Sequence, residues 1–220
     1  MIITIDGPAG SGKSTAARRL AKKLEIAFLD TGATYRAVTL KALGEGTDLH
    51  DPQAMASIAR EAHITMMPEG EEVRVLLDNH DVSEEIRSAR ITEHTRYAAT
   101  YPEVREVLVE LQRKLGRQLG EFVTEGRDQG SVVFPDADVK FYLDASPEVR
   151  AQRRLDEMHE RGEDEQFEAV LEAIKERDHR DMTREVGPLR QADDAIVVDT
   201  SQKNIDEVVA ELLRLVREKS

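Results

Sequence analysis

The first candidate for chemistry is a run of glycines and hydroxyl side chains near the N-terminus, GPAGSGKS at residues 7–14. It fits the pattern G-x-x-x-x-G-K-[ST] in full and lies between an apolar run, residues 1–6, and a stretch with helical periodicity. Glycines let the backbone curl so that successive N–H groups cradle phosphate oxygens at the positive end of the following helix. An ordinary glycine-rich turn is disfavoured by the full motif in this context. The loop therefore predicts a nucleoside-triphosphate site.

Two side chains of this loop have predicted chemical roles. Lys13 is expected to reach the β- and γ-phosphates of ATP, and the Ser14 hydroxyl to complete the coordination shell of Mg²⁺. The predicted ATP-binding residues are Gly7, Pro8, Ala9, Gly10, Ser11, Gly12, Lys13, Ser14 and Thr15. Phosphoryl transfer needs positioning and charge neutralisation rather than a covalent nucleophile, so the lack of a catalytic triad is consistent with this chemistry.

Arginines outside the loop indicate what the triphosphate acts on. Arg36 follows a predicted strand in DTGATYR, Arg127 follows another in EGRDQG, and Arg177, Arg180 and Arg184 lie in KERDHRDMTRE. Each arginine alone is more typical of a solvated surface charge. Because the loops that follow parallel strands share one edge of the sheet, however, Arg36 and Arg127 should converge near the P-loop. Guanidinium groups bind phosphate in a bidentate manner, which favours an acceptor that itself carries a phosphate.

A further basic cluster lies in RAQRRLDEMHERGEDE, where arginines precede a glycine on a predicted helix. The cluster consists of Arg150, Arg153, Arg154 and Arg161. These residues could form a lid that closes over the triphosphate, excludes water and adds positive charge. The interleaved residues Asp156, Glu157 and Glu160 fit a salt-bridged, exposed helix equally well. The spacing leaves both alternatives open.

Alternating strands and helices must position these groups. Strands are predicted at residues 1–6, in IAFLDTG, in EFVTEG, in ADVKFYL and, as a final buried strand, in AIVVDT. Helices are predicted from Ser14, in ATYRAVTLKALGEG, near 51–63, from Ser83, over 102–119, over 147–184 with a break at ERGEDE, and at the C-terminus. Ser146 is expected to cap the helix that Pro147 begins. The alternation predicts an α/β fold with a parallel sheet, and period-two alternation over 64–82 around a Pro-Glu-Gly turn predicts a small antiparallel insertion.

Composition excludes several classes of protein. The chain has 220 residues, no cysteine and a formal net charge of −13, which suits one α/β domain without disulfides. The negative charge and the 4% aromatic content oppose nucleic-acid binding. No run reaches the roughly 18 apolar residues of a membrane span, and the apolar N-terminus is too short for a signal peptide. We therefore expect a cytoplasmic protein without a membrane partner.

Four segments together resemble the bacterial cytidylate kinases, over essentially the whole chain from Ile3 to the C-terminal helix. They are IDGPAGSGKST, LDTGATYRA, GRDQGSVVFPDADVKFYLDAS and IKERDHRDMTREVGPL. The first is generic, whereas the patterns GRDxGxVVFPDA and ERDxRDxxR are specific. The resemblance implies a P-loop nucleoside-monophosphate kinase fold with a parallel five-stranded core sheet and flanking helices. It also implies a single domain, 1–220, with a monophosphate-binding insertion at about 34–105 and a short lid at about 153–165.

The resemblance further implies that ATP phosphorylates CMP or dCMP to CDP or dCDP, with Mg²⁺. The residues implied to bind CMP are Thr31, Tyr35, Arg36, Arg105, Arg127, Arg177, Asp181 and Arg184. The residues implied in catalysis are Lys13, Arg127, Asp128, Arg153 and Arg154. Among these, three arginines (36, 127 and 177) would hold the CMP phosphate.

The remaining residues have narrower implied roles. Asp181 would accept hydrogen bonds from the ribose hydroxyls, whereas Arg105 and Arg184 would help to recognise cytosine. Asp128 would brace the arginine cluster. Either of the two lid arginines, 153 or 154, would contact ATP. Arg96 stands where the family has a serine that contacts the base, and three alternatives follow: the neighbouring Thr95 substitutes, Arg96 makes a different contact, or base discrimination is looser.

Other functions remain as alternatives. Another small-molecule P-loop kinase, of the UMP or shikimate type, is the nearest, and Asp181 separates them because a ribose-binding carboxylate has no use in a shikimate site. A nucleotide switch would need a base-selecting signature and a releasable segment, and the guanine-type pattern N-K-x-D is absent. Nothing in the sequence indicates an obligate dimer, so we expect a monomer that acts on small molecules.

Overall fold

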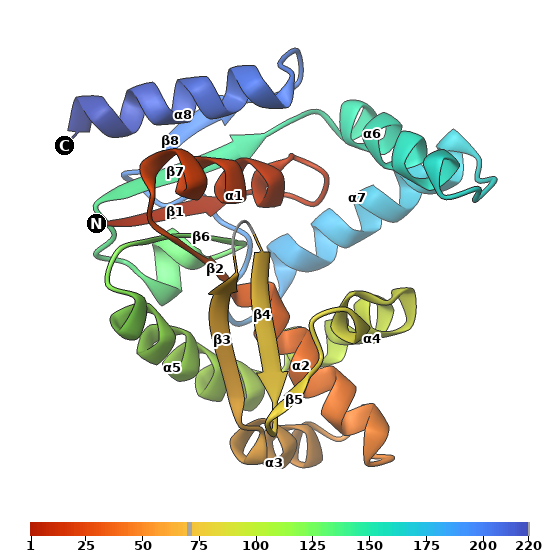
Figure 1. Ribbon diagram of the computed structural model, residues 1–220. Helices are drawn as coiled ribbons and strands as arrows, with labels where there is room; N and C mark the ends of the chain where they lie inside the picture. Colours follow the sequence, from red (N-terminus) through yellow and green to blue (C-terminus); the bar gives the residue numbers. More distant parts are fainter. Residues whose placement is uncertain (70–71, 220) are drawn as a thin grey trace.

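Five parallel strands form the central sheet, in the order β2-β6-β1-β7-β8 (Figure 1). The computed structural model describes residues 1–69 and 72–219. The strands are β1 (Ile2–Asp6), β2 (Ala27–Asp30), β6 (Phe122–Gly126), β7 (Val139–Asp144) and β8 (Ile196–Asp199). Helices α1 (Lys13–Leu24) and α8 (Ile205–Lys219) lie on one side of the sheet, and α5 (Pro102–Leu119) lies on the other (Figure 1). The predicted α/β fold with a five-stranded parallel core is therefore confirmed.

The central strand β1 is more deeply buried than the edge strand β8. Ile3 and Ile5 of β1 are fully buried because β1 has a strand on each side and helices over both faces. The prediction of a buried final strand was wrong for β8, in which Val198 is buried but Val197 is 49% exposed. This strand pairs only with β7 and forms the edge of the sheet, so it has a neighbouring strand on one side only.

The register of the sheet sets the level at which the loops leave it. Asp6, the last residue of β1, is aligned with Gly126 at the end of β6, and Asp30 of β2 is aligned with Glu125. The loops that follow β1, β2 and β6 therefore start at nearly the same height on neighbouring strands. This is the edge at which open α/β sheets bind ligands.

The segment between β2 and β6 adds a second, antiparallel sheet. Its elements are α2 (Thr31–Gly44), α3 (Pro52–Glu61), β3 (Ile64–Glu69), β4 (Glu72–Leu77), β5 (His80–Asp81), the 3₁₀ turn η1 (Glu85–Arg87) and α4 (Ala89–Thr100). The predicted antiparallel patch is confirmed. Of the predicted Pro-Glu-Gly turn, Pro68 and Glu69 belong to β3 instead, and Gly70 lies outside the described residues. The predicted insertion, 34–105, would begin within α2 and end within α5, and its role stays a prediction.

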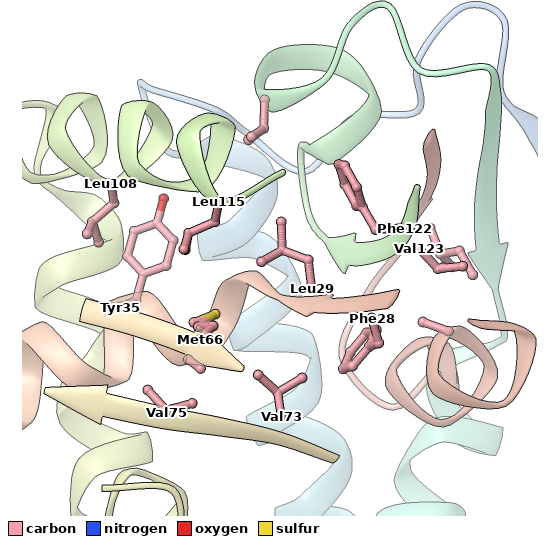
Figure 2. Close-up of a cluster of buried hydrophobic side chains, with 14 of the residues drawn as sticks. Phe28, Leu29, Tyr35, Met66, Val73, Val75, Leu108, Leu115, Phe122 and Val123 are labelled. Carbon is pink, nitrogen blue, oxygen red and sulfur yellow. The ribbon is translucent and has the colours of Figure 1, made fainter. Parts of the chain in front are cut away.

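One hydrophobic core joins the two sheets. Figure 2 shows Leu29 of β2 beside Phe122 and Val123 of β6, with Met66 of β3 and Val75 of β4 on the side of the antiparallel sheet. Tyr35 of α2 and two leucines of α5 lie in the same cluster (Figure 2). The antiparallel sheet is thus packed onto the core rather than attached by a flexible linker.

The two helices α6 (Pro147–Glu160) and α7 (Phe167–Thr183) form a hairpin beside the sheet (Figure 1). Ser146 caps α6, since its hydroxyl accepts a hydrogen bond from the Val149 N–H, and Pro147 occupies the first turn as predicted. The hairpin has its own small apolar cluster: Ala151, Leu155, Val170 and Ile174. The predicted lid, 153–165, comprises the second half of α6 and most of the connection to α7. No helix in residues 1–69 and 72–219 is long and apolar enough to cross a membrane.

Candidate active site

The P-loop follows β1 and ends in the first turn of α1. Gly7 has a φ of 152°, and a Cβ there would lie 2.1 Å from the carbonyl oxygen of Leu143 on β7, so a side chain is excluded. The Lys13 ammonium turns back to donate a hydrogen bond to the Pro8 carbonyl oxygen at 3.1 Å. The lysine is therefore already held beside the loop whose backbone would bind phosphate.

A carboxylate that the sequence did not single out lies next to this loop. Glu125 on β6 accepts a 2.8 Å hydrogen bond from the Ser14 hydroxyl. Its signal in the sequence is weak: one acidic residue at the carboxyl end of a strand, two positions before Arg127. Only the pairing of β6 with β1 shows that it faces the P-loop.

A cavity of about 560 Å³ opens between the P-loop, α2, α4, α7 and the loop after β6. All the predicted CMP-binding residues line it: Thr31, Tyr35, Arg36, Arg105, Arg127, Arg177, Asp181 and Arg184. Ala9, Gly10, Lys13, Ser14 and Asp128 also line it. The expected convergence of Arg36 and Arg127 beside the P-loop is thus present in the fold.

The arginines in this cavity differ in how many of their N–H groups the protein already uses. Arg127 donates from Nε to Asp181 at 2.8 Å and from Nη1 to the Gly126 carbonyl at 3.2 Å. Arg36 pairs with Asp30 at 2.9 Å. Arg177 makes no hydrogen bond or ion pair with the part of the chain that the structure describes. Oriented guanidinium groups with free N–H groups are a site for an anion.

Below this cluster, Asp128 connects two further arginines. It forms a buried ion pair with Arg105, and the Arg184 guanidinium lies 3.6 Å away on its other side. The Arg105 guanidinium also lies over the ring of Tyr35, 5.7 Å from its centroid. Burial raises the pKa of Tyr35. Asp128 thus contacts both arginines, and Arg105 lines the cavity. The bracing role of Asp128 stays a prediction.

Two ionisable groups at this edge have strongly shifted pKa values. Burial lowers the pKa of Lys13 to about 7, and the cationic Arg127 and Arg177 contribute to the shift. Burial raises the pKa of Asp6 to about 7, although this carboxylate accepts hydrogen bonds from the N–H groups of Gln129 and Gly130, each at 2.8 Å. Asp6 thereby fixes the short π-helical turn η2 (Gln129–Val133) that follows Arg127, where the sequence predicted a loop. A depressed lysine pKa in a cavity is typical of a functional site.

The predicted lid arginines lie outside the described lining of this cavity. Arg153 donates to the Thr200 hydroxyl at 3.1 Å and to the Thr200 carbonyl, in the loop between β8 and α8. Arg154 pairs with Glu157 on the surface of α6 at 3.1 Å, as the exposed-helix alternative describes. Arg150, in contrast, is buried, and the sequence did not distinguish it from its neighbours. A contact of residues 153 or 154 with ATP stays a prediction.

Arg96 and Thr95 both line the end of the cavity formed by α4. The Thr95 hydroxyl donates a 2.7 Å hydrogen bond to the Ile91 carbonyl within its own helix. Arg96 lies over the Tyr97 ring, 5.0 Å from its centroid, and donates to the Tyr97 hydroxyl at 3.2 Å. Neither side chain is withdrawn from the cavity, so this end presents an arginine where the resemblance implied a serine.

The chain is similar over essentially its whole length to known proteins of one family. A family model described as cytidylate kinase matches residues 3–218. A cytidylate kinase of Rhodococcus opacus (strain B4) is 49% identical over 222 residues, which cover 100% of this chain and 96% of that protein. A cytidylate kinase of Carboxydothermus hydrogenoformans is 46% identical over 220 residues, covering 100% and 99% of the two chains.

Solved structures agree on the fold at lower identity. The structure of TT1252 from Thermus thermophilus is similar with a TM-score of 0.50 at 19% identity, and covers 100% of this chain and 97% of that one. An uncharacterised protein from Eubacterium ventriosum gives a TM-score of 0.53 at 13% identity, with 99% and 98% coverage. Together with the P-loop and the arginine-lined cavity, the match over residues 3–218 leads to one conclusion: the chain belongs to the cytidylate kinase family.

Proposed function

We propose that the protein transfers the γ-phosphoryl group of ATP to CMP and dCMP, giving ADP and CDP or dCDP. The observation that carries this proposal is one cavity with a P-loop lysine on one side and several arginines on the other. A P-loop binds the donor phosphates, and a second cationic group suits a phosphorylated acceptor. Membership of the cytidylate kinase family supports cytidine monophosphates as that acceptor.

The donor side of the site would act through the P-loop and α1. Backbone N–H groups of residues 7–14 would hold the β- and γ-phosphates, and Lys13 would leave the Pro8 carbonyl to follow the charge of the migrating phosphoryl group. The Ser14 hydroxyl and the Glu125 carboxylate, 2.8 Å apart, are the hard oxygen donors that Mg²⁺ prefers, so we propose that they hold it with ATP. When bound, Mg²⁺ neutralises charge on the β- and γ-phosphates.

The acceptor side would act through the loop after β6 and through α7. Arg36, Arg127 and Arg177 would bind the phosphate of CMP and orient one of its oxygens toward the γ-phosphorus. The Arg127 pKa remains raised by Asp181, despite burial, so the guanidinium stays charged. Asp181 would in turn accept hydrogen bonds from the ribose while it holds Arg127. Burial opposes ionisation of this carboxylate, but the neighbouring Arg127 lowers its pKa overall, which keeps it an acceptor.

The base would occupy the end of the cavity formed by α4 and by the Arg105–Asp128–Arg184 cluster. Arg105 and Arg184 would donate to the acceptor atoms of cytosine. Asp128 would keep both arginines in place, because it lies between them. Arg96 would contribute a further donor at this end, since it lines the cavity where a base would lie. A base rich in hydrogen-bond acceptors, as cytosine is at O2 and N3, suits such a donor-rich wall.

An assay of ADP release with ATP and Mg²⁺ tests the function directly. CMP, dCMP, UMP, AMP and shikimate are offered in parallel as acceptors. Preference for CMP and dCMP is the expected result. Equal turnover of UMP would keep the kinase but refute the assignment of the base-binding residues, and turnover of shikimate alone would establish the alternative. ADP release that does not depend on any acceptor would refute the proposal.

A monomeric state and a cytoplasmic location belong to the same proposal. The negative net charge of −13 also supports small-molecule substrates rather than a nucleic acid. Size-exclusion chromatography with light scattering, over a range of protein concentrations, tests the monomer. A mass of two chains at every concentration would contradict it.

A further inference from the structure

A buried arginine joins the P-loop to the helix that carries acceptor-binding residues. Arg150 on α6 donates from Nη1 to the Ala9 carbonyl of the P-loop at 3.0 Å and from Nη2 to Asp178 of α7 at 2.6 Å. Its Nε donates to the Ala145 carbonyl at 2.8 Å, which fixes the guanidinium at the base of its own helix. The residue is only 3% exposed. One planar group therefore touches three separate segments.

The position of Asp178 makes this contact more than a local brace. It directly follows Arg177 in α7 and precedes Asp181 by three residues, so all three lie within little more than one turn of the helix. Arg177 and Asp181 both line the cavity proposed to bind CMP. A shift of Asp178 along its hydrogen bond would consequently shift the acceptor-binding side chains with it.

The hairpin of α6 and α7 packs around an apolar cluster of its own. Its apolar cluster (Ala151, Leu155, Val170 and Ile174) is separate from the main core. Polar contacts of Arg150 therefore connect it to the P-loop, and the loop backbone lies close against the helix: a Cβ on Gly10 would be 3.1 Å from the Arg150 Cβ. Polar contacts between two packed bodies can be exchanged at lower cost than apolar packing can be rebuilt.

One atom of the pair has no partner among the residues that the structure describes. Asp178 Oδ1 is buried and accepts no hydrogen bond from them, whereas its Oδ2 accepts from Arg150. A buried carboxylate oxygen without a donor is costly. Oδ1 thus offers the Arg150 guanidinium a second acceptor on the same carboxylate.

We propose that the Arg150–Asp178 pair positions the P-loop and α7 relative to each other, so that ATP in the loop increases the affinity of the cavity for CMP. The inference rests on the proposed function, since it concerns the two ligands of that reaction. Neither residue contacts a reacting atom, and both act through the segments they hold. By thermodynamic reciprocity, CMP must increase the affinity for ATP by the same factor.

Calorimetric titration of CMP measures this coupling in the full-length protein. CMP is titrated with and without saturating Mg²⁺ and a non-hydrolysable ATP analogue, and the ratio of the two dissociation constants gives the coupling. For the wild type we expect a ratio of at least about 5, the lower end of typical allosteric coupling. The double variant Arg150→Met/Asp178→Asn removes both charges together, so that neither is left buried alone. Its ratio should fall to within about twofold of one.

A control ion pair elsewhere on the P-loop helix tests whether the loss of any interhelical ion pair changes the ratio, and melting by circular dichroism measures the stability of each variant. Arg19 and Asp206 form an interhelical ion pair at 2.7 Å that joins α1 to α8 away from the cavity. Arg19→Met/Asp206→Asn should keep the wild-type ratio. Arg150→Lys, which preserves the charge with fewer N–H groups, should give an intermediate ratio and serves in place of the double variant if that variant does not fold.

The outcomes distinguish this inference from the proposed function. A wild-type ratio of one, or a wild-type ratio retained in the folded double variant, would overturn the coupling, while turnover of CMP would leave the kinase assignment intact. A single variant, Arg150→Lys, with an unchanged ratio would overturn it as well. Wild-type protein that does not bind CMP at all would refute the proposed function, and the inference with it.

Discussion

Replacing Arg127 by methionine should remove much of the acceptor-binding energy without disturbing the donor site. A guanidinium has five N–H groups, and the structure shows two of those in Arg127 used by Asp181 and the Gly126 carbonyl. Three N–H groups remain for a phosphate, enough for two charge-assisted hydrogen bonds. Each such bond contributes about 1.5–3 kcal/mol, so the pair contributes about 3–6 kcal/mol, or roughly 10²- to 10⁴-fold in kcat/KM for CMP.

The assay is steady-state ADP release with CMP as the varied substrate and ATP at saturation. Arg127→Lys keeps the charge but loses the bidentate fork, and its kcat/KM should fall between those of the wild type and the methionine variant. Binding of the ATP analogue should change by less than about threefold in both variants, because Arg127 is on the acceptor side of the cavity. Circular dichroism melting checks that both variants are folded.

The reasoning would be refuted if Arg127→Met retained a kcat/KM for CMP within about threefold of wild type, since two charge-assisted bonds cannot be lost at that cost. A parallel loss of affinity for the ATP analogue would also count against it. That result would mean that Arg127 supports the whole cavity rather than the acceptor phosphate.

Three further predictions concern other residues of the site and its surroundings. Asp181→Ala should raise KM for CMP by about tenfold and leave KM for ATP nearly unchanged, in the same ADP-release assay, because one charged hydrogen bond is lost on the acceptor side alone. Lys13, with a pKa of about 7, is largely neutral at about pH 8.5 and should regain its proton when ATP binds beside it. Calorimetric titration of ATP in buffers of different ionisation enthalpy should therefore show proton uptake that increases from about pH 6.5 to 8.5. This uptake should be lost in Lys13→Met. Gly187→Ala should lower the free energy of urea unfolding by at least about 3 kcal/mol, because the new Cβ would overlap the buried Arg105–Asp128 ion pair. Gly46 has a similar positive φ but open space around it, so Gly46→Ala should lower the free energy of unfolding by only about 1–2 kcal/mol. A KM for CMP that is unchanged in Asp181→Ala would contradict the first prediction, and proton uptake retained in Lys13→Met would contradict the second. An equal loss of unfolding free energy in Gly187→Ala and Gly46→Ala would contradict the third.

Much of the fold was predictable because its signals are local. The caps and breaks of the α6–α7 hairpin follow from Ser146, Pro147 and the glycine at its tip, which act on their own neighbours in the chain. The antiparallel sheet follows from alternation over about twenty residues. The final strand was placed correctly, but its burial was not, because an edge position depends on which strands lie beside it.

The residue types of the site were also predictable, whereas most of their partnerships were not. Glu125 and Arg150 carry no distinctive local pattern, yet one bonds to the P-loop hydroxyl and the other to a P-loop carbonyl. Their partners lie 111 and 141 positions away in the chain. No spacing rule of a helix or strand extends that far.

By itself, the sequence determined that a phosphate-binding loop starts at Gly7 and that arginines follow later strands. These features depend on backbone freedom, helix polarity and charge, which each short segment carries with it. The sequence also predicted that Arg127 lies near this loop, because loops after parallel strands share one edge of the sheet. Only the tertiary structure decided that Asp6 is level with Gly126, and that Glu125 and Arg150 reach the P-loop. Strand order and register are set by the packing of distant apolar faces, and so they emerge only when the whole chain is folded.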